Sequence, residues 1–128
     1  MSPKTLVSPA MTIAICTRNR AHFLEKAVRS SLAQLGDKTD ILIVDNASTD
    51  KTSEAAAKLS AENSQVSWIP QTEIGVSATR NAALLHAKGD YVIFLDDDET
   101  ARPGWLDAYA NFFTHPPSQK IGCVGGPY

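Results

Sequence analysis

The sequence lacks any excess of positive charge: 12 Lys and Arg residues against 14 Asp and Glu residues give a formal net charge of −2. Nonspecific binding to nucleic acid requires a basic surface, so no nucleic acid is expected as a partner. No apolar run reaches the roughly 20 residues that a transmembrane helix needs. The first ten residues, MSPKTLVSPA, lack a charged stretch followed by a long apolar core, and we therefore expect no signal peptide.

Cysteine is also scarce, with only Cys16 and Cys123 in the chain. Both lie inside apolar runs, and the expectation is two buried, reduced thiols of a cytosolic protein rather than a disulfide. The 128 residues have the length of one domain, and 43% of them are hydrophobic, which is enough for a core without a stabilising metal or disulfide. We expect residues 1–11 to be a lead-in and residues 12–128 to form a single domain.

Apolar runs of strand length alternate with stretches of helical spacing along the chain. This alternation predicts a three-layer α/β/α fold, with a mostly parallel sheet and helices on both of its faces. Thr17 or Asn19 is placed to cap the first helix, and Gly36 to end it. The predicted strands span residues 12–16, 41–44, 66–69, 91–95 and 121–124, and the predicted helices span residues 20–35, 52–62, 75–88 and 105–113.

The stretch YVIFLDDDE, residues 91–99, places five apolar residues directly before four consecutive acids. The apolar part is typical of a strand covered on both faces, and ligands of open α/β sheets bind outside the carboxyl ends of the strands. Asp96 and Asp98 would point the same way, because side chains alternate along a strand. A divalent cation would relieve the repulsion among the acids, and oxygen ligands favour Mg²⁺ or Mn²⁺. The alternative is a solvated acidic loop.

Polar side chains also follow the first two predicted strands, at residues 17–19 and at Asp45 and Asn46. Since the carboxyl ends of parallel strands meet at one edge of a sheet, we expect these side chains to converge with the acids. Asp45 could accept hydrogen bonds from a base or a ribose, or it could be a turn residue. Gly75 opens a helix whose free N–H groups suit phosphate, and Arg80 could pair with phosphate oxygens or balance the acids. The combination indicates a nucleoside diphosphate bound through a metal.

Four blocks of the sequence, in this order and at these spacings, resemble the family-2 glycosyltransferases: TIAICTRNR, ILIVDNASTDKT, EIGVSATRNAALLHAKGDYVIFLDDDE and RPGWL. The resemblance runs from Thr12 to about Tyr128. It implies the GT-A fold, with a Rossmann-like sheet that would end here after about five strands. It also implies that residues 96–98 are the D-x-D motif of the family, with Asp98 as the main metal ligand and Asp96 on the metal or the ribose.

The same resemblance assigns roles outside the acids. Thr17 and Asp45 match the positions that hold the base and the ribose, and Arg80 matches the basic residue of the family's A-R-N segment, near the base and the diphosphate. That segment reads ATRN here, with one residue between Ala and Arg. The remaining residues predicted to bind the donor are Asn19, Asn46, Gly75 and Asp97.

The implied reaction transfers a sugar, with inversion, from a nucleoside-diphosphate sugar to a hydroxyl of a carbohydrate or lipid-linked acceptor. The cation, Mn²⁺ or Mg²⁺, neutralises charge on the leaving diphosphate, and a carboxylate takes the acceptor proton. In this family that base lies in the second half, and no acid follows Asp107 here, so no base is assigned. We expect a cytoplasmic donor-binding half with little turnover, at most peripheral to the inner membrane face, whose exposed apolar surface could promote self-association.

Two other functions remain open at this point. The stretch LDDDET also matches the D-x-D-x-T motif of haloacid-dehalogenase-type phosphatases, in which Asp96 would be the nucleophile and Asp98 the acid/base. That motif normally opens its fold and is followed by a lysine and further acids, whereas here it comes late and only Lys120 follows. The other alternative is a non-catalytic binding or assembly module that keeps the sheet.

Overall fold

The computed structural model describes residues 9–114 and 122–125, in which four strands alternate with four helices. The strands are β1 (Met11–Thr17), β2 (Thr39–Asn46), β3 (Val66–Gln71) and β4 (Tyr91–Phe94). The helices are α1 (Ala21–Leu32), α2 (Thr52–Glu62), α3 (Val76–His86) and α4 (Trp105–Thr114). The alternation read from the sequence is therefore confirmed, and α2 begins and ends at the predicted residues.

The strands form one parallel sheet in the order β3-β2-β1-β4. Met11 of β1 pairs with Thr39 of β2 on one side and with Tyr91 of β4 on the other. The chain therefore builds outward from β1 in one direction through β2 and β3, and then returns to add β4 on the opposite side. In open α/β sheets, a ligand crevice forms where the strand order reverses in this way, outside the carboxyl ends of the strands.

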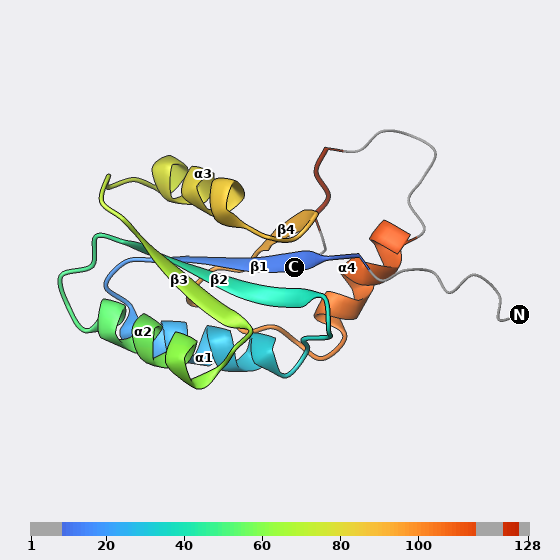
Figure 1. Cartoon of the computed structure of the whole chain (residues 1–128), viewed down its shortest axis with the longest axis horizontal. Helices are drawn as coiled ribbons and strands as arrows, with labels where there is room; N and C mark the ends of the chain where they lie inside the picture. The colour runs from blue at the N-terminus through green and yellow to red at the C-terminus, as the bar shows by residue number, and fades with distance from the viewer. Residues whose placement is uncertain (1–8, 115–121, 126–128) are drawn as a thin grey trace, which may run out of the picture.

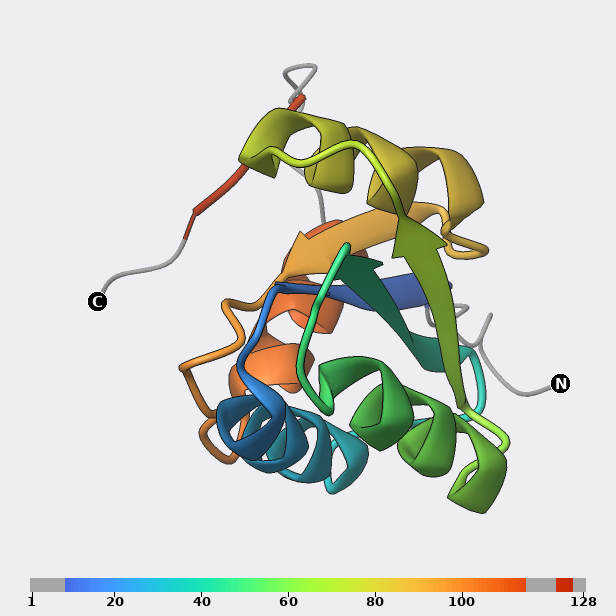
Figure 2. The same ribbon diagram turned by 90° about the vertical axis from the view of Figure 1, so that its left-hand side faces the viewer.

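The two faces of the sheet carry separate hydrophobic clusters. Helices α1, α2 and α4 cover one face and α3 covers the other (Figure 2). On the first face, Ile13 and Ile15 pack in a large cluster with apolar residues of these three helices, including Leu24 and Leu106. On the second face the intervening Ala14 belongs to a smaller cluster with residues of β2 and α3. The alternating side chains of β1 thus divide between the two cores.

Helix α1 departs from the predicted capping. Its N-cap residue is Arg20, which makes no side-chain capping hydrogen bond. The prediction that Thr17 or Asn19 caps the helix is wrong, because both side chains have partners in other segments of the chain. The regular helix also ends at Leu32, before the predicted stop at Gly36.

Strand β4 is less buried than the sequence indicated. Tyr91 and Phe94 are 37% and 38% exposed, and β1 is the only strand that pairs with β4 in the described part of the chain. The expectation of a strand covered on both faces therefore holds only in part: Ile93 packs in the cluster on one face and Val92 against the cluster on the other, while Tyr91 and Phe94 stay partly exposed. The fifth predicted strand is also wrong over residues 122–124, which form no ladder, while residue 121 lies outside the described residues. Glycine weakens strands, and this short segment is bounded by Gly122 and Gly125.

The cysteines do not share one environment. Cys16 is partly buried in β1, and burial raises the pKa of its thiol to about 11. Cys123 is exposed, so the prediction that it is buried is wrong. Neither forms a disulfide. Among the described helices, none is long and apolar enough to cross a membrane.

Candidate functional site

The loops that follow β1, β2 and β3 lie together on the left-hand side of Figure 1, at the carboxyl edge of the sheet. Thr17 at the end of β1 is in register with Asp45 near the end of β2. The acids after β4 reach the same edge, because the Thr17 hydroxyl donates a 2.9 Å hydrogen bond to Oδ2 of Asp97. The predicted convergence of these polar side chains on one edge is therefore present in the fold, and we refer to it as the carboxyl-edge site.

Asp45 is almost fully buried, with 3% of its surface exposed. Its two carboxylate oxygens each accept a hydrogen bond, one from the hydroxyl of Ser48 and one from the hydroxyl of Ser53. Neither serine was predicted as a site residue. A carboxylate oxygen has two lone pairs, so Asp45 keeps the capacity to accept a further donor while its orientation is fixed by the protein.

Asn46 links β2 to the start of α3. Its Nδ2 donates to the carbonyl oxygens of Gln71, at 3.1 Å, and Glu73, at 2.7 Å, and its Oδ1 accepts the N–H of Gly75 at 3.0 Å. Gly75 has φ 152° and ψ 148°, a conformation that glycine adopts without the strain that a Cβ would add. The Asn46 side chain is thus occupied by protein groups, and its contribution is to position the helix terminus.

Residues 18 and 19 fasten the loop after β1 to the loop after β2. Nη1 of Arg18 donates to the carbonyl oxygens of Asn46 and Ala47, at 2.8 and 2.7 Å. Oδ1 of Asn19 accepts the N–H of Thr49 at 2.8 Å. Within the second loop, Ala47 has φ 51°, an uncommon value for a residue with a side chain.

The acidic cluster is organised around one buried carboxylate. Asp97 is 8% exposed, and burial raises the pKa of its carboxyl, opposed by the hydrogen bond from Thr17 and the positive charge of Arg20. Asp96 and Asp98, its neighbours in the sequence, are exposed. All three acids lie beyond the end of β4 at Phe94, so the strand alternation that predicted a common direction for Asp96 and Asp98 does not extend to them. Nη1 of Arg20 lies 3.5 Å from Oδ1 of Asp97 and 3.2 Å from Oδ2 of Asp98.

Arg20 was not predicted as a site residue, yet it forms the ion pairs with the acidic cluster. Its signal was its place directly after the polar residues that end β1. Arg80, which was selected, is exposed, and its guanidinium carbon lies 5.9 Å from the centroid of the Phe94 ring. That distance is within the range of a cation–π contact. The ion pairs with Asp97 and Asp98 are thus made by the N-cap residue that precedes α1 and not by Arg80 of α3.

The residues of the cluster fit a cation only as part of a shared coordination sphere. Within residues 9–114 and 122–125, no three His, Cys, Asp or Glu side chains are grouped as a metal cage. Mg²⁺ in phosphate-handling sites takes one or two carboxylates and completes its shell with phosphate oxygens and water. Asp96 and Asp98 offer oxygen ligands only, which suits a hard cation held partly by a phosphate group.

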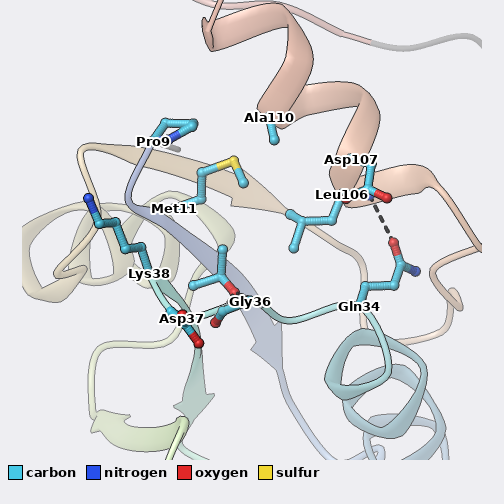
Figure 3. A pocket seen from close by; sticks show the side chains of 10 residues that line it. Pro9, Met11, Gln34, Gly36, Asp37, Lys38, Leu106, Asp107 and Ala110 are labelled. Carbon is cyan, nitrogen blue, oxygen red and sulfur yellow. Dashed lines mark hydrogen bonds between the residues drawn. The ribbon is translucent and has the colours of Figure 1, made fainter. Parts of the chain in front are cut away.

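A separate cavity of about 450 Å³ lies near the amino ends of the strands, away from the carboxyl-edge site. Met11, Leu106 and Ala110 point toward it, and a dashed line joins the Gln34 side chain to the backbone of α4 (Figure 3). That bond runs from the N–H of Leu106 to Oε1 of Gln34 at 2.8 Å. No cluster of charged groups comparable to the acidic cluster is present among its lining residues, so we do not place the functional site there.

Comparison with known proteins identifies the class to which this fold and site belong. Residues 12–125 match the model of glycosyl transferase family 2, and the chain belongs to this family. The fold is accordingly that of the GT-A glycosyltransferases. The family assignment removes the basis for the phosphatase alternative, which depended on a short motif alone.

Individual relatives agree with the family assignment. Glycosyltransferase GlyA of Streptococcus pneumoniae is 31% identical over 102 residues, covering 80% of this chain and 15% of that protein. Chondroitin synthase of Pasteurella multocida is 33% identical over 116 residues, covering 91% of this chain and 12% of that protein. The mannosyltransferase PcManGT of Pyrobaculum calidifontis, solved with GDP-Man and Mn²⁺, aligns with a TM-score of 0.73 and 29% identity, covering 84% of this chain and 32% of that one. The chain therefore spans less than a third of each of these proteins.

Proposed function

We propose that this chain is the donor-binding half of a glycosyltransferase, which binds a nucleoside-diphosphate sugar together with Mn²⁺ or Mg²⁺. The observation that carries the proposal is the hydrogen bond between Thr17 and Asp97, residues 80 positions apart in sequence. It joins the end of β1 to the acidic cluster after β4, while Asp45 lies in register with Thr17. The positions proposed to bind the base and the metal therefore lie at one edge of the sheet.

The nucleoside part of the donor would be held at the ends of β1 and β2. Asp45 accepts N–H or hydroxyl donors of the base or ribose, since its carboxylate is buried and already oriented by two serine hydroxyls. Thr17 flanks the same position. Asn19 and Asn46 act at one remove, because their side chains fix the loops that form the edge. This division of roles refines the prediction that all four residues contact the donor.

The diphosphate would lie between α3 and the acidic cluster. Gly75 leaves the first turn of α3 open to a close approach of phosphate, where the free N–H groups of the helix favour negative charge. Arg80 adds a guanidinium one turn further along the helix. Asp98 and Asp96 are the proposed metal ligands, and Asp97 supports them from its buried position beside Thr17. The bound cation would neutralise charge on the diphosphate as the sugar leaves.

The proposed reaction is the inverting transfer of the sugar to a hydroxyl of a carbohydrate or lipid-linked acceptor. A carboxylate must take the acceptor proton in such a displacement. The chain spans less than a third of each relative named above, and the acids of the cluster are assigned to the metal and the donor. We therefore expect the 128-residue chain to bind donor while transferring little sugar. The Mn²⁺ and GDP-Man in the PcManGT structure support the donor and metal roles by similarity.

Calorimetry with UDP, GDP and dTDP, each with and without Mn²⁺, tests the proposal. We expect at least one nucleotide to bind in a metal-dependent manner. Asp98→Asn should weaken that binding by roughly tenfold or more, since a charged metal ligand is lost. Asp107→Asn, an exposed acid at the start of α4, is the charge-matched control and should leave it unchanged.

Two results would contradict the proposal in different ways. Failure of all three nucleotides to bind, with or without metal, would favour the non-catalytic module. Efficient sugar transfer by the 128-residue chain would instead leave donor binding intact and refute the expectation of low turnover.

A further inference from the structure

Arg20 is a half-exposed residue that forms ion pairs with two carboxylates of the acidic cluster. Its Nη1 lies 3.2 Å from Oδ2 of Asp98 and 3.5 Å from Oδ1 of Asp97. The two carboxylates differ in freedom: the Asp97 side chain is 11% exposed and held by Thr17, whereas that of Asp98 is 50% exposed. The guanidinium therefore sits between a fixed carboxylate and one that is free to turn.

The backbone of Arg20 is fixed while its side chain is not. Its N–H donates to Oγ1 of Thr52 at 3.0 Å, and its carbonyl oxygen accepts the N–H of Leu24 at 2.9 Å as α1 begins. The side chain is 49% exposed, and its ion pair with the equally exposed Asp98 is of the kind that contributes little stability. The guanidinium can thus leave the carboxylates without any rearrangement of the backbone.

We propose that in the nucleotide-free protein the guanidinium of Arg20 lies where a divalent cation would approach Asp98. The binding of metal and the binding of nucleotide are cooperative for this reason. The inference rests on the proposed function and adds a binding order to it. A divalent cation that approaches Asp98 alone meets the positive charge of Arg20 and must displace it. A nucleoside diphosphate supplies oxygens with which the guanidinium can form a new bidentate pair, which frees Asp98 for the metal.

The consequence is a coupling between two ligands that is reciprocal by thermodynamic necessity. Metal should bind weakly alone and more tightly when diphosphate is present, and diphosphate should bind more tightly when metal is present. Arg80 does not provide this coupling, because its guanidinium lies over Phe94 and the ion pairs of the cluster come from Arg20.

A titration with Mn²⁺ alone tests the proposal directly. The free Mn²⁺ is measured by its electron paramagnetic resonance signal. Arg20→Met should bind Mn²⁺ roughly 3- to 10-fold more tightly than the unchanged chain, as expected when one unit charge near an exposed divalent site is removed. Arg20→Lys keeps the charge and should remain close to the unchanged chain. Arg29→Met removes another exposed arginine of α1, one paired with Glu25, and should have no effect.

The same variants are then titrated with Mn²⁺ in the presence of saturating GDP or UDP. In the unchanged chain, nucleotide should raise the affinity for Mn²⁺. In Arg20→Met this increase should be smaller, by the same factor by which the substitution raises the affinity for Mn²⁺ in the absence of nucleotide. Circular dichroism checks that each variant is folded. If Arg20→Met does not fold, Arg20→Gln is used in its place to remove the charge.

The outcomes separate this inference from the proposed function. Equal or weaker binding of Mn²⁺ alone by the folded charge-removing variant overturns the role of Arg20, whatever the nucleotides do. Absence of nucleotide binding in the unchanged chain overturns the proposed function, while the comparison in Mn²⁺ alone still decides whether Arg20 competes with the cation.

Discussion

Replacement of Asn46 tests whether one buried amide holds the start of α3 at the carboxyl-edge site. Asn46 is 6% exposed and makes three hydrogen bonds, two through Nδ2 and one through Oδ1. Each such bond contributes about 0.5–1.5 kcal/mol net, so Asn46→Ala should lower the free energy of unfolding by about 2–4 kcal/mol. Urea denaturation followed by tryptophan fluorescence measures this change.

Asn46→Asp is nearly the same in shape and adds a test that depends on pH. It keeps the acceptor for the N–H of Gly75 but turns a carboxylate toward the carbonyl oxygens of Gln71 and Glu73. Burial raises the pKa of this new carboxyl above the value of about 3.9 in the unfolded chain. The native state then binds the proton more tightly than the unfolded state does. The free energy of unfolding of the variant, relative to the unchanged chain, should therefore increase as the pH is lowered from 7 to 4. The gain is lost when the pH is raised through the pKa of the folded state.

The alanine variant is the matched control, because it loses the same donors without gaining a titratable group. Its deficit relative to the unchanged chain should stay nearly constant between pH 7 and pH 4. The reasoning would be refuted if both variants lost less than about 1 kcal/mol, since three buried hydrogen bonds would then contribute almost nothing. A deficit of the aspartate variant that did not narrow in acid would show that its carboxyl is not buried against the carbonyls.

Three further changes test local features of the fold. A Cβ at Gly89 would lie 2.6 Å from a backbone nitrogen of β1, so Gly89→Ala should lower the free energy of unfolding by about 1–3 kcal/mol in urea denaturation. The control is Gly36→Ala, where a Cβ would meet nothing within 4 Å and the change should be less than about 0.5 kcal/mol. Equal effects of the two substitutions would contradict the close approach at Gly89. Because Ala47 has φ 51°, Ala47→Gly should raise the free energy of unfolding by about 0.5 kcal/mol. Ala57→Gly, inside α2, should lower it by about 0.5–1 kcal/mol. A change of the same sign in both variants would contradict backbone strain at Ala47. Burial raises the pKa of Cys16 from 9.0 to about 11, so roughly 0.1% of the thiol is thiolate at pH 8 instead of roughly 10%. Its alkylation by iodoacetamide, measured by mass spectrometry in a chain without the other cysteine, should therefore be about 100-fold slower than that of a free thiol. Labelling at the rate of a free thiol would show that Cys16 is not buried.

The order of elements could be predicted because each is encoded by neighbouring residues. The apolar run of residues 12–16 marks β1, and in the structure Ile13 and Ile15 pack on one face of the sheet while Ala14 packs on the other. Helix spacing and glycine stops placed α2 and α3 to within two residues of their observed ends. Parallel strands between helices then require that Thr17, Asp45 and the acids after β4 meet at one edge.

The same local reasoning failed where a partner lies far away in the chain. The sequence could not show that Thr17 and Asn19 bond to other loops instead of capping α1, since those partners are 80 and 30 residues away. It could not show that β4 lies at an edge of the described sheet, because strand order depends on which strands pair and not on the composition of each one.

The sequence by itself determined that this protein is an α/β domain of alternating elements with carboxylates at the ends of its strands, because periodicity and strand ends are properties of consecutive residues. Only the tertiary structure decided which groups hold those carboxylates: Ser48 and Ser53 for Asp45, and Thr17 and Arg20 for Asp97. The physical reason is that hydrogen bonds and ion pairs act over a few ångströms, and Arg20 reaches Asp97, 77 residues along the chain, only after β1 and β4 have paired.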